Sequence, residues 1–476
     1  MKRIACFLIA TLFAFGGVGC ASGNSAYTHK AGAPDYSQAD GVLLLDSWIP
    51  PQASDEGFAT YADCGYNMLH CGVTSLQIGG EGGIANEQRK LEDNFAYAQK
   101  HGLKVIISMN ALNMNQRVAT PLRYLDTRIG TVLEKWKDND TFYGYMPYDE
   151  PFFDRELDAG NPDMMQKGYD RIIDYIRDEY LYFSSKYPGK AFEIVTLGKT
   201  INPITANYGK SFGGDFDAFY NFYEDNFLKL LPYDERIISF DAYPFNTDER
   251  DGSLTLYRGF VSSLEALGYR AENLHAAEKG TYIQNHHTVY NTAQVLWQYY
   301  TAMAYGYTHF TTYCYREEWG NKVFSLSERG EKTANWYYFQ KAHNEIKSFE
   351  NVYMQFVDGW QGAMTFDGTE RVDEDPSYKY CTRQLKSYDG LKSVTSTQDT
   401  LVGIMKDKNG YDGYLITNQA VPRANTGSTV EATFNGATHA VVYADGKSEV
   451  RELQNGKLTL DLKAGGGAFV VPYMEK

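Results

Sequence analysis

The sequence is poor in cysteine and in positive charge, and both shortages narrow the class of protein. Its 476 residues include 6 cysteines, too few and too scattered for the disulfide framework of a small secreted domain. Lys and Arg number 45 against 60 Asp and Glu, which gives a formal net charge of -15. An acidic chain without a basic run repels phosphate and uronate backbones at long range, so we expect no nucleic acid and no polyanionic polysaccharide as partner.

Short metal-binding and nucleotide-binding motifs are also missing. No Cys or His spacing is typical of a metal site, and the tandem pair His286-His287 is interpreted as part of a loop, because adjacent residues seldom converge on one ion. After the first predicted strand the chain continues as Ser47-Trp48-Ile49 and two prolines, where a dinucleotide-binding fold has a glycine-rich turn. The sequence therefore predicts no metal and no cofactor.

The first twenty residues have the order of an export signal. Lys2 and Arg3 precede an apolar stretch from Ile4 to Phe15, and small residues then lead to Gly19 and Cys20. The apolar stretch, about a dozen residues, is too short for a permanent transmembrane helix. The segment resembles the bacterial lipoprotein signal, which implies removal of residues 1–19 and lipidation of Cys20.

The lipoprotein resemblance also implies a location. We expect an exported protein of the bacterial cell envelope, held to the lipid bilayer through Cys20. Ala21, rather than Asp, follows this cysteine, which in Gram-negative lipoproteins is compatible with sorting to the outer membrane, although the membrane face stays open. Gly17 stands where the pattern usually has Leu, so cleavage without lipidation is the alternative.

The remaining chain divides into three parts. Residues 20–38, rich in Ala, Gly and Ser, predict a flexible tether. Residues 39–351 alternate between short apolar runs and amphipathic stretches, which predicts an α/β fold, namely a (β/α)8 barrel. A doubly wound sheet is the alternative. The predicted strands are 41–46, 67–71, 103–109, 142–148, 192–197, 236–243, 273–277 and 309–315.

Residues 352–476 change to short alternating strands separated by Gly, Asn and Asp turns, as in Val402–Met405, Gly413–Ile416 and His439–Tyr443. This pattern predicts an antiparallel β-sandwich domain. We interpret it as a domain that braces the barrel, and a sugar-binding role is the alternative.

Carboxylates follow two of the predicted strands, where barrel enzymes place their catalytic groups. The fourth strand ends before Asp149 and Glu150, and Glu278 follows the seventh. Hydrolysis of a glycosidic bond with retention needs a carboxylic acid and a second carboxylate about 5.5 Å away. Strands four and seven can face each other across a barrel, so the sequence predicts such a pair.

The motif Asp149-Glu150-Pro151 and the position of Glu278 resemble the retaining β-glycoside hydrolase superfamily, whose (β/α)8 barrel carries an Asn-Glu-Pro acid/base after strand four and a Glu nucleophile after strand seven. The resemblance implies that Glu150 is the acid/base, that Glu278 is the nucleophile, and that Tyr243 donates a hydrogen bond to Glu278. Asp149 departs from the family's Asn, which commonly bonds the sugar 2-hydroxyl. An Asp accepts that bond but cannot donate an amide proton.

Aromatic and polar residues near the strand ends complete the predicted site. Flat rings cover pyranose faces and small polar groups bond hydroxyls, so we expect substrate contacts from Trp48, Tyr148, Tyr243, Tyr313, Tyr315 and Trp319, together with Asp149, His70, Asn110 and Asp241. The predicted substrate is a neutral poly- or oligosaccharide. Two alternatives stay open: a carbohydrate-binding surface lipoprotein with a catalytically degenerate barrel, which the Asp149 departure favours, and a structural surface protein without a ligand.

Overall fold

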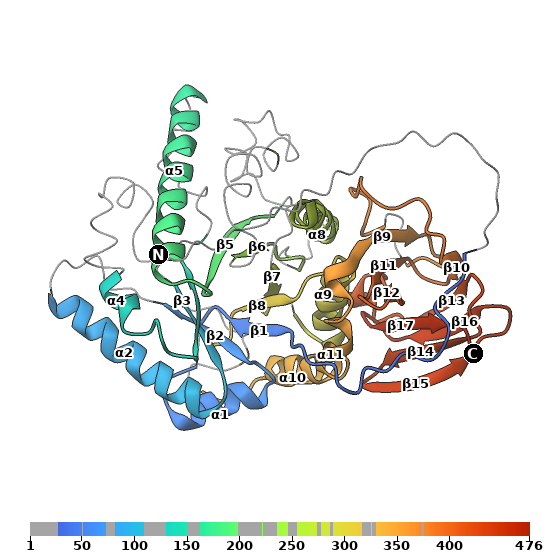
Figure 1. The fold of residues 1–476 in the computed structure, drawn as a ribbon, viewed down its shortest axis with the longest axis horizontal. Helices are drawn as coiled ribbons and strands as arrows, with labels where there is room; N and C mark the ends of the chain where they lie inside the picture. Colours follow the sequence, from blue (N-terminus) through green and yellow to red (C-terminus); the bar gives the residue numbers. More distant parts are fainter. Residues whose placement is uncertain are drawn as a thin grey trace, which may run out of the picture.

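The computed structural model describes most of the chain between residues 27 and 476. The described residues are 27–49, 51–72, 81–108, 130–147, 149, 162–198, 221, 236–245, 255–273, 278–285, 289–316, 325, 330–372 and 376–476. They form an eight-stranded parallel sheet followed by a separate antiparallel domain (Figure 1). The strands of the parallel sheet are β1 (Leu44–Ser47), β2 (Met68–Gly72), β3 (Lys104–Ser108), β4 (Phe142–Met146), β5 (Ala191–Leu197), β6 (Arg236–Asp241), β7 (Glu278–Gln284) and β8 (His309–Tyr313).

The parallel sheet closes into a barrel. Its strand order is β1-β8-β7-β6-β5-β4-β3-β2, and the first strand pairs in parallel with the last. β1 and β2 meet through Asn67, whose side-chain amide donates to the carbonyl of Leu43 at 2.7 Å and accepts from the N–H of Leu45 at 2.9 Å. Pairing of the first strand with the last confirms the (β/α)8 barrel and rules out the doubly wound alternative, in which the first strand lies inside an open sheet.

Helices cover the outer face of the barrel strands (Figure 1). They are α1 (Asp55–Asp63), α2 (Glu81–Lys100), α4 (Thr131–Glu134), α5 (Pro162–Lys186), α8 (Thr255–Asn273), α9 (Thr292–Ala304), α10 (Ala334–Lys347) and α11 (Glu350–Tyr353). α9 begins after Asn291, whose side chain accepts from the N–H of Gln294 at 2.9 Å and so satisfies a free amide of the first turn. Among the described helices, none is long and apolar enough to cross a membrane.

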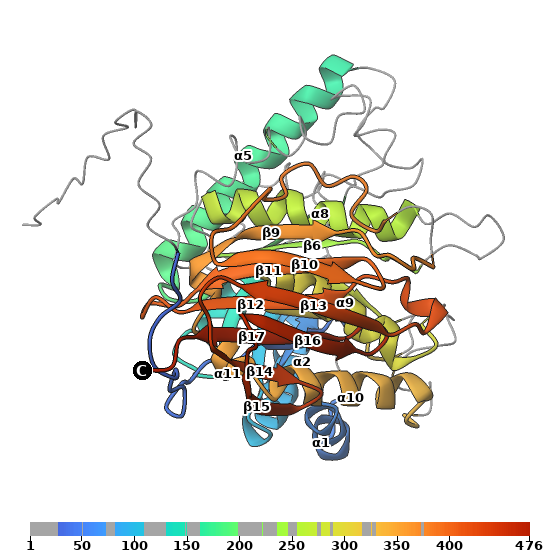
Figure 2. The ribbon, with the colours of Figure 1, turned by 90° about the vertical axis from the view of Figure 1, so that its right-hand side faces the viewer.

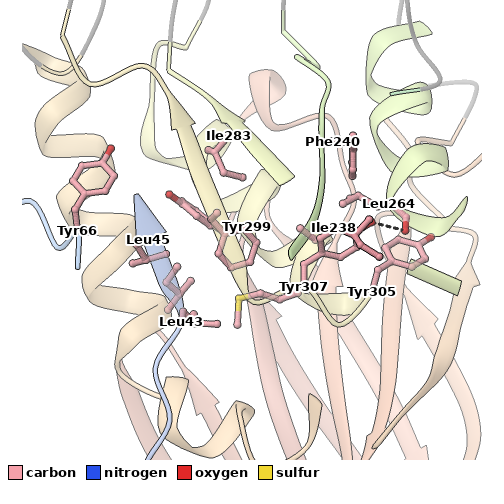
Figure 3. Packing of buried hydrophobic residues seen from close by; sticks show 14 of the residues in the cluster. Leu43, Leu45, Tyr66, Ile238, Phe240, Leu264, Ile283, Tyr299, Tyr305 and Tyr307 are labelled. Atoms are coloured by element: carbon pink, nitrogen blue, oxygen red, sulfur yellow. Dashed lines mark hydrogen bonds between the residues drawn. The ribbon is translucent and has the colours of Figure 1, made fainter. Parts of the chain in front are cut away.

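The main core lies between the strands and these helices. Figure 3 shows part of it, with Leu45 of β1 and Ile283 of β7 near Tyr299 of α9. Tyr307 lies in the same layer, and its hydroxyl donates to the carbonyl of Leu264 on α8 at 3.1 Å. Many of the chain's tyrosines therefore serve as packing residues whose hydroxyls find backbone partners.

One predicted strand is wrong. Each of the other seven overlaps an observed strand, but Asn273 is the last residue of α8, and β7 begins only at Glu278. The residues of β7 that favour a strand, Tyr282 and Ile283, follow a charged start, Glu278-Lys279. A buried strand that opens on two charges does not have the apolar run expected of it, which explains the error.

The C-terminal domain is an antiparallel β-sandwich, as predicted (Figure 2). One sheet has the order β15-β14-β17-β12-β11-β9 and the other has the order β10-β13-β16, with an apolar core between them. Their strands are β9 (Trp360–Phe366), β10 (Leu391–Ser396), β11 (Thr400–Lys406), β12 (Asp412–Asn418), β13 (Ser428–Phe434), β14 (His439–Ala444), β15 (Lys447–Glu452), β16 (Lys457–Leu462) and β17 (Gly467–Tyr473).

The six-stranded sheet packs against α9 of the barrel. Gly403 of β11 lies so close to α9 that a Cβ atom there would stand 2.2 Å from the carbonyl oxygen of Ala304. The indole of Trp360 donates to the same carbonyl at 3.0 Å. Elsewhere, Glu265 of α8 accepts backbone N–H groups from Thr382 and Arg383, at 2.7 and 2.9 Å. The barrel and the sandwich therefore share one extended, close-packed interface.

Residues 27–38 lie on the β-sandwich. Tyr27 donates a hydrogen bond to the carboxylate of Asp412, and Nδ1 of His29 lies 3.2 Å from the same carboxylate. Tyr36 donates to Asp407 at 3.0 Å. The prediction of a flexible tether through residue 38 is therefore wrong from residue 27 onwards, because these side chains have partners on the sandwich. Residues 20–26 of that segment lie outside the described residues.

Candidate functional site

Five predicted site residues lie at the carboxyl ends of the barrel strands. Trp48 follows β1, Asp149 follows β4, Asp241 and Tyr243 lie at the end of β6, and Tyr313 is the last residue of β8. All five are half-buried. They come from four strands, and closure of the barrel directs the ends of these strands to one rim, where barrel enzymes build their active sites.

Aromatic rings line this rim. The rings of Tyr243 and Tyr313 are 5.4 Å apart between centroids and inclined by 40°. Trp48 lies 6.1 Å from the ring of Tyr282, a buried residue of β7. Trp48 and Tyr313 also pack against the small buried cluster of Ile49 and Cys314. The rim thus presents partly exposed rings held at fixed angles, which is the kind of surface that flat, hydroxyl-rich ligands stack on.

Tyr282 links this aromatic surface to a carboxylate. Burial, and after it the nearby negative charge of Asp149, raises the pKa of the Tyr282 hydroxyl well above its ordinary value. This hydroxyl is buried and has no hydrogen-bond partner among the described residues. Tyr282 therefore keeps its proton, and Asp149 lies within electrostatic reach of it.

Glu278 is not at this rim. It is the first residue of β7, and the strand rises about 3.3 Å per residue, so Glu278 lies about 20 Å along the strand from its carboxyl end. Its partner is Tyr143 of β4, which donates a hydrogen bond to its carboxylate, and not Tyr243. Burial raises the pKa of Glu278, a shift opposite in direction to the one that helps a nucleophile to stay ionised. These observations contradict the predicted position and environment of Glu278.

Amides occupy the carboxyl end of β7 instead. The side-chain oxygen of Gln284 accepts from the N–H of Phe245 at 2.8 Å. The Asn285 side chain donates to the carbonyl of Cys314 at 2.9 Å and to the hydroxyl of Ser325 at 2.7 Å. Both amides therefore hold neighbouring loops in place, and no described residue at this strand end supplies a carboxylate.

His70 lies inside the barrel rather than at its rim. It occupies the middle of β2, its side chain is 0% exposed, and its ring packs edge-on against Trp48 at 5.6 Å. Its Nε2 atom lies 3.2 Å from Asp46 and 3.0 Å from Glu193. Enclosed between carboxylates in this way, His70 does not reach a sugar hydroxyl, and its predicted role as a substrate contact is wrong.

The sequence analysis missed the polar group to which His70 belongs. His309 of β8 completes it, with Nε2 2.9 Å from Oδ2 of Asp46. Although burial opposes the charge, Asp46 raises the pKa of His309 to about 9, and Asp46 and Glu193 raise that of His70. Asp46, His70 and Glu193 each interrupt an apolar strand of the barrel, and that interruption was the available signal.

Tyr315 faces away from the barrel interior. It is 0% exposed, and its ring meets those of Tyr61, on α1, and Tyr66 edge-on at 4.8 and 5.6 Å. It therefore belongs to the layer between the strands and the helices, and its predicted role in a sugar subsite is wrong.

Glu150, Tyr148, Asn110, Trp319 and Cys20 lie outside the described residues. Asp149, the neighbour of Glu150 in the sequence, is described and lies after β4 at the same rim as Asp241 and Tyr313.

No family model and no curated protein sequence matches the chain. Solved structures do resemble it. A family 39 glycoside hydrolase from the gut symbiont Bacteroides cellulosilyticus WH2 has a TM-score of 0.51 at 10% identity, covering 91% of this chain and 81% of its own. Gan42B, a GH42 β-galactosidase from G. stearothermophilus, has a TM-score of 0.52 at 10% identity, covering 94% and 99%. At this identity the likeness concerns the fold alone, which in this chain is a (β/α)8 barrel followed by a β domain.

Proposed function

We propose that the chain is a glycoside hydrolase that cleaves β-glycosidic bonds of a neutral poly- or oligosaccharide. The observation that carries this proposal is the combination, at one rim, of the carboxylates Asp149 and Asp241 with the rings of Trp48, Tyr243 and Tyr313. Carboxyl groups supply the acid and the nucleophile of glycoside hydrolysis, and the rings supply stacking surfaces for sugars. The two hydrolases that share the fold support the same class of reaction.

The proposed mechanism retains the anomeric configuration. Glu150 protonates the leaving oxygen and later activates the water molecule that releases the sugar. Because Glu278 does not lie at the rim, we assign the role of nucleophile to Asp241. Among the last residues of the eight described barrel strands, Asp241 is the one that carries a carboxylate. Attack of Asp241 on the anomeric carbon forms a glycosyl-enzyme ester as the leaving group departs with the proton from Glu150.

Site variants test these roles on a panel of aryl β-glycosides and neutral β-glucans. Asp241→Asn should abolish turnover of all of them, because no glycosyl-enzyme forms. Glu150→Ala should still react with aryl glycosides whose leaving group needs no proton, and azide should restore the second step by replacing the activated water. Full activity in a folded Asp241→Asn protein would refute its role as nucleophile.

A specific observation favours a second candidate. Gln284 ends β7, where the resembled superfamily has its nucleophile, and its amide is engaged by Phe245. A barrel that has lost this carboxylate can still bind sugars, so a carbohydrate-binding protein is the alternative. Calorimetry with unlabelled oligosaccharides separates the two: binding without release of reducing sugar over long incubation supports the binder, and release that depends on Glu150 supports the enzyme.

We also propose that the protein is exported and anchored to the cell envelope by a lipid on Cys20. The support is the order of charge, apolar core and small residues before this cysteine. Metabolic labelling with a radioactive fatty acid should mark the wild-type protein and not the Cys20→Ser variant. Equal labelling of the wild-type protein and the Cys20→Ser variant would refute lipidation at Cys20.

A further inference from the structure

A cluster of buried polar side chains lies one layer deeper in the barrel than Trp48, and the proposed hydrolysis does not use it. Asp46 of β1, His70 of β2, Glu193 of β5 and His309 of β8 have side chains at most 1% exposed. Donor atoms of Asp46, His70 and His309 all lie within 4.8 Å of one another. We propose that these four side chains bind one divalent transition-metal ion, with zinc as the best match, in a closed site inside the barrel.

The distances between donor atoms suit a common ion. Oδ2 of Asp46 lies 2.9 Å from Nε2 of His309 and 3.2 Å from Nε2 of His70, which in turn lies 3.0 Å from Oε2 of Glu193. Two ligands that each bind zinc at about 2.0–2.1 Å with tetrahedral geometry are about 3.3 Å apart. The donors of Asp46, His70 and His309 all lie within 4.8 Å of one another and could therefore share one ion. Oε2 of Glu193 is close to His70 but does not belong to this group of three, so it would have to move further than the others to complete the set.

The hydrogen bonding of the cluster is incomplete without an ion. Both ring nitrogens of His70 lack a hydrogen-bond partner among the described residues, although Nε2 lies at ion-pair distance from two carboxylates. Oε2 of Glu193 is also without a hydrogen bond in the described part of the chain. Buried polar atoms of this kind are rare, because each costs about 1–3 kcal/mol when it is left unsatisfied.

The second oxygen of Glu193 is fixed from outside the cluster. Oε1 accepts a hydrogen bond from the hydroxyl of Ser239 on β6 at 2.9 Å. This leaves Oε2 directed toward His70, and carboxylates that bind metals are commonly oriented by such a bond. Ser239 thus presets the geometry of one proposed ligand.

Charge balance is compatible with a divalent ion. Asp46 and Glu193 bring two negative charges into a site without solvent, and a dication with two neutral imidazoles cancels them. Two imidazolium groups would cancel them as well, so a metal-free ion-pair network is the competing outcome. A set of two imidazoles and two carboxylates suits zinc better than calcium or magnesium, which prefer oxygen ligands alone.

The site lies where an ion would add most to the fold. Asp46 and His70 come from β1 and β2, the two strands that are neighbours without a ladder in the described sheet and that meet through Asn67. With four protein ligands and no open position, the ion would hold this seam together rather than activate water. The proposal therefore predicts a change in stability and does not depend on the hydrolase proposal.

Metal analysis of the full-length protein, purified without chelator or metal-affinity tag, tests the site. Mass spectrometry of the elements should find close to one zinc ion per chain. After removal with a chelator, the melting temperature should fall and should recover on addition of Zn²⁺. Co²⁺ added instead should give the visible absorption of a four-coordinate site. Absence of metal, with no response to Zn²⁺ or Co²⁺, would establish the metal-free network and overturn the proposal.

Variants assign the ion to these residues. His70→Gln should lose the metal, and Glu193→Gln, which keeps the bond from Ser239, should weaken its retention. The matched control is His343→Gln on α10, a buried histidine bonded to the carbonyl of Cys64 at 2.8 Å. It should lower the melting temperature but keep the metal. Unchanged metal content in a folded His70→Gln protein would overturn the assignment. If this variant does not fold, the cobalt spectrum of the wild-type protein still tests whether the site binds a metal ion.

Discussion

Tyr143 of β4 donates a hydrogen bond to Glu278, the first residue of β7, across the interior of the barrel. The carboxyl oxygen Oε2 of Glu278 is buried and has no partner in the described residues. Burial raises the pKa of this carboxyl, and the charge of His309 together with the bond from Tyr143 offsets only part of the effect. Glu278 is thus a buried carboxyl of the barrel floor with a raised pKa, far from the rim where sugars would bind.

Replacement of Glu278 by Gln should therefore spare activity. The amide is neutral and its oxygen still accepts from Tyr143, so we expect kcat within about threefold of wild type, because an uncharged isostere leaves the rim unchanged. A folded Glu278→Gln protein without any turnover, tested on the aryl glycosides, would restore Glu278 as the nucleophile.

The same variant should change the pH dependence of stability. Since the folded pKa of Glu278 is raised above its ordinary 4.5, the stabilisation from its proton is complete below that value and is lost as the pH rises through the folded pKa. Wild type should therefore lose stability relative to Glu278→Gln as the pH is raised from about 4 to about 8. Thermal melts of both proteins across this range measure the difference, and parallel curves would contradict it.

Asp412 should be the anchor of the N-terminal segment. Burial by itself would raise the pKa of the Asp412 carboxyl. Hydrogen bonds from His29, Tyr27, Tyr388 and Lys406 outweigh burial and hold this pKa at about 2. The folded pKa is depressed, so the stabilisation is present above the unfolded value of 3.8 and is lost as the pH falls toward 2.

We expect Asp412→Asn to cost about 2 kcal/mol at neutral pH and much less near pH 2. Urea unfolding at several pH values measures the difference, and proteolysis should reach residues 27–38 sooner in the variant. The control is Asp461→Asn, an exposed carboxylate that accepts from Thr429 at 2.8 Å. Equal effects of the two variants would show that burial and the bonding network around Asp412 add nothing.

The contact of Gly403 with α9 should be intolerant of a methyl group. A Cβ atom would lie 2.2 Å from the carbonyl oxygen of Ala304, and overpacking of this kind costs about 1–3 kcal/mol. Gly403→Ala should lower the melting temperature and increase dye binding to exposed apolar surface. Gly72→Ala, where the added carbon has no atom of the described residues within 4 Å, should leave both unchanged. An unchanged melting temperature of Gly403→Ala would show that the interface between barrel and sandwich accommodates a methyl group at little cost in stability.

The barrel and the sandwich could be predicted because their signals are local. An apolar run such as Leu43-Leu44-Leu45 is buried on both faces of a parallel strand, and the change to short alternating strands after residue 352 marks a second fold. These patterns depend on neighbours in the sequence. Errors of a few residues at the ends of strands did not alter the fold.

The site was predicted less well because it depends on which end of a strand a residue occupies and on which face it lies. The predicted seventh strand ended just before Glu278, whereas the observed β7 begins at Glu278. This residue therefore lies at the floor of the barrel and not at the rim. Asp46, His70 and Glu193 are far apart in the sequence and meet only after the barrel closes, so no spacing motif exists for them. Residues 150–161 lie outside the described residues, so the role of Glu150 stays a prediction from sequence.

Tyr313 and Tyr315 provide the sharpest test of the rim, because two tyrosines one residue apart have different environments. Tyr313 is half-buried and lies 5.4 Å from the ring of Tyr243, whereas Tyr315 is 0% exposed against Tyr61. Loss of a stacking ring costs about 1.4 kcal/mol of binding, which is about tenfold in affinity. Tyr313→Ala should therefore raise KM, or the Kd of an oligosaccharide measured by calorimetry, about tenfold with little change in melting temperature. Tyr315→Ala should instead lower the free energy of unfolding by about 3–5 kcal/mol and leave KM or Kd unchanged, because it opens a cavity between strand and helix. If Tyr315→Ala weakened sugar binding in the folded protein while Tyr313→Ala did not, the rim formed by Trp48, Tyr243 and Tyr313 would not be the substrate site.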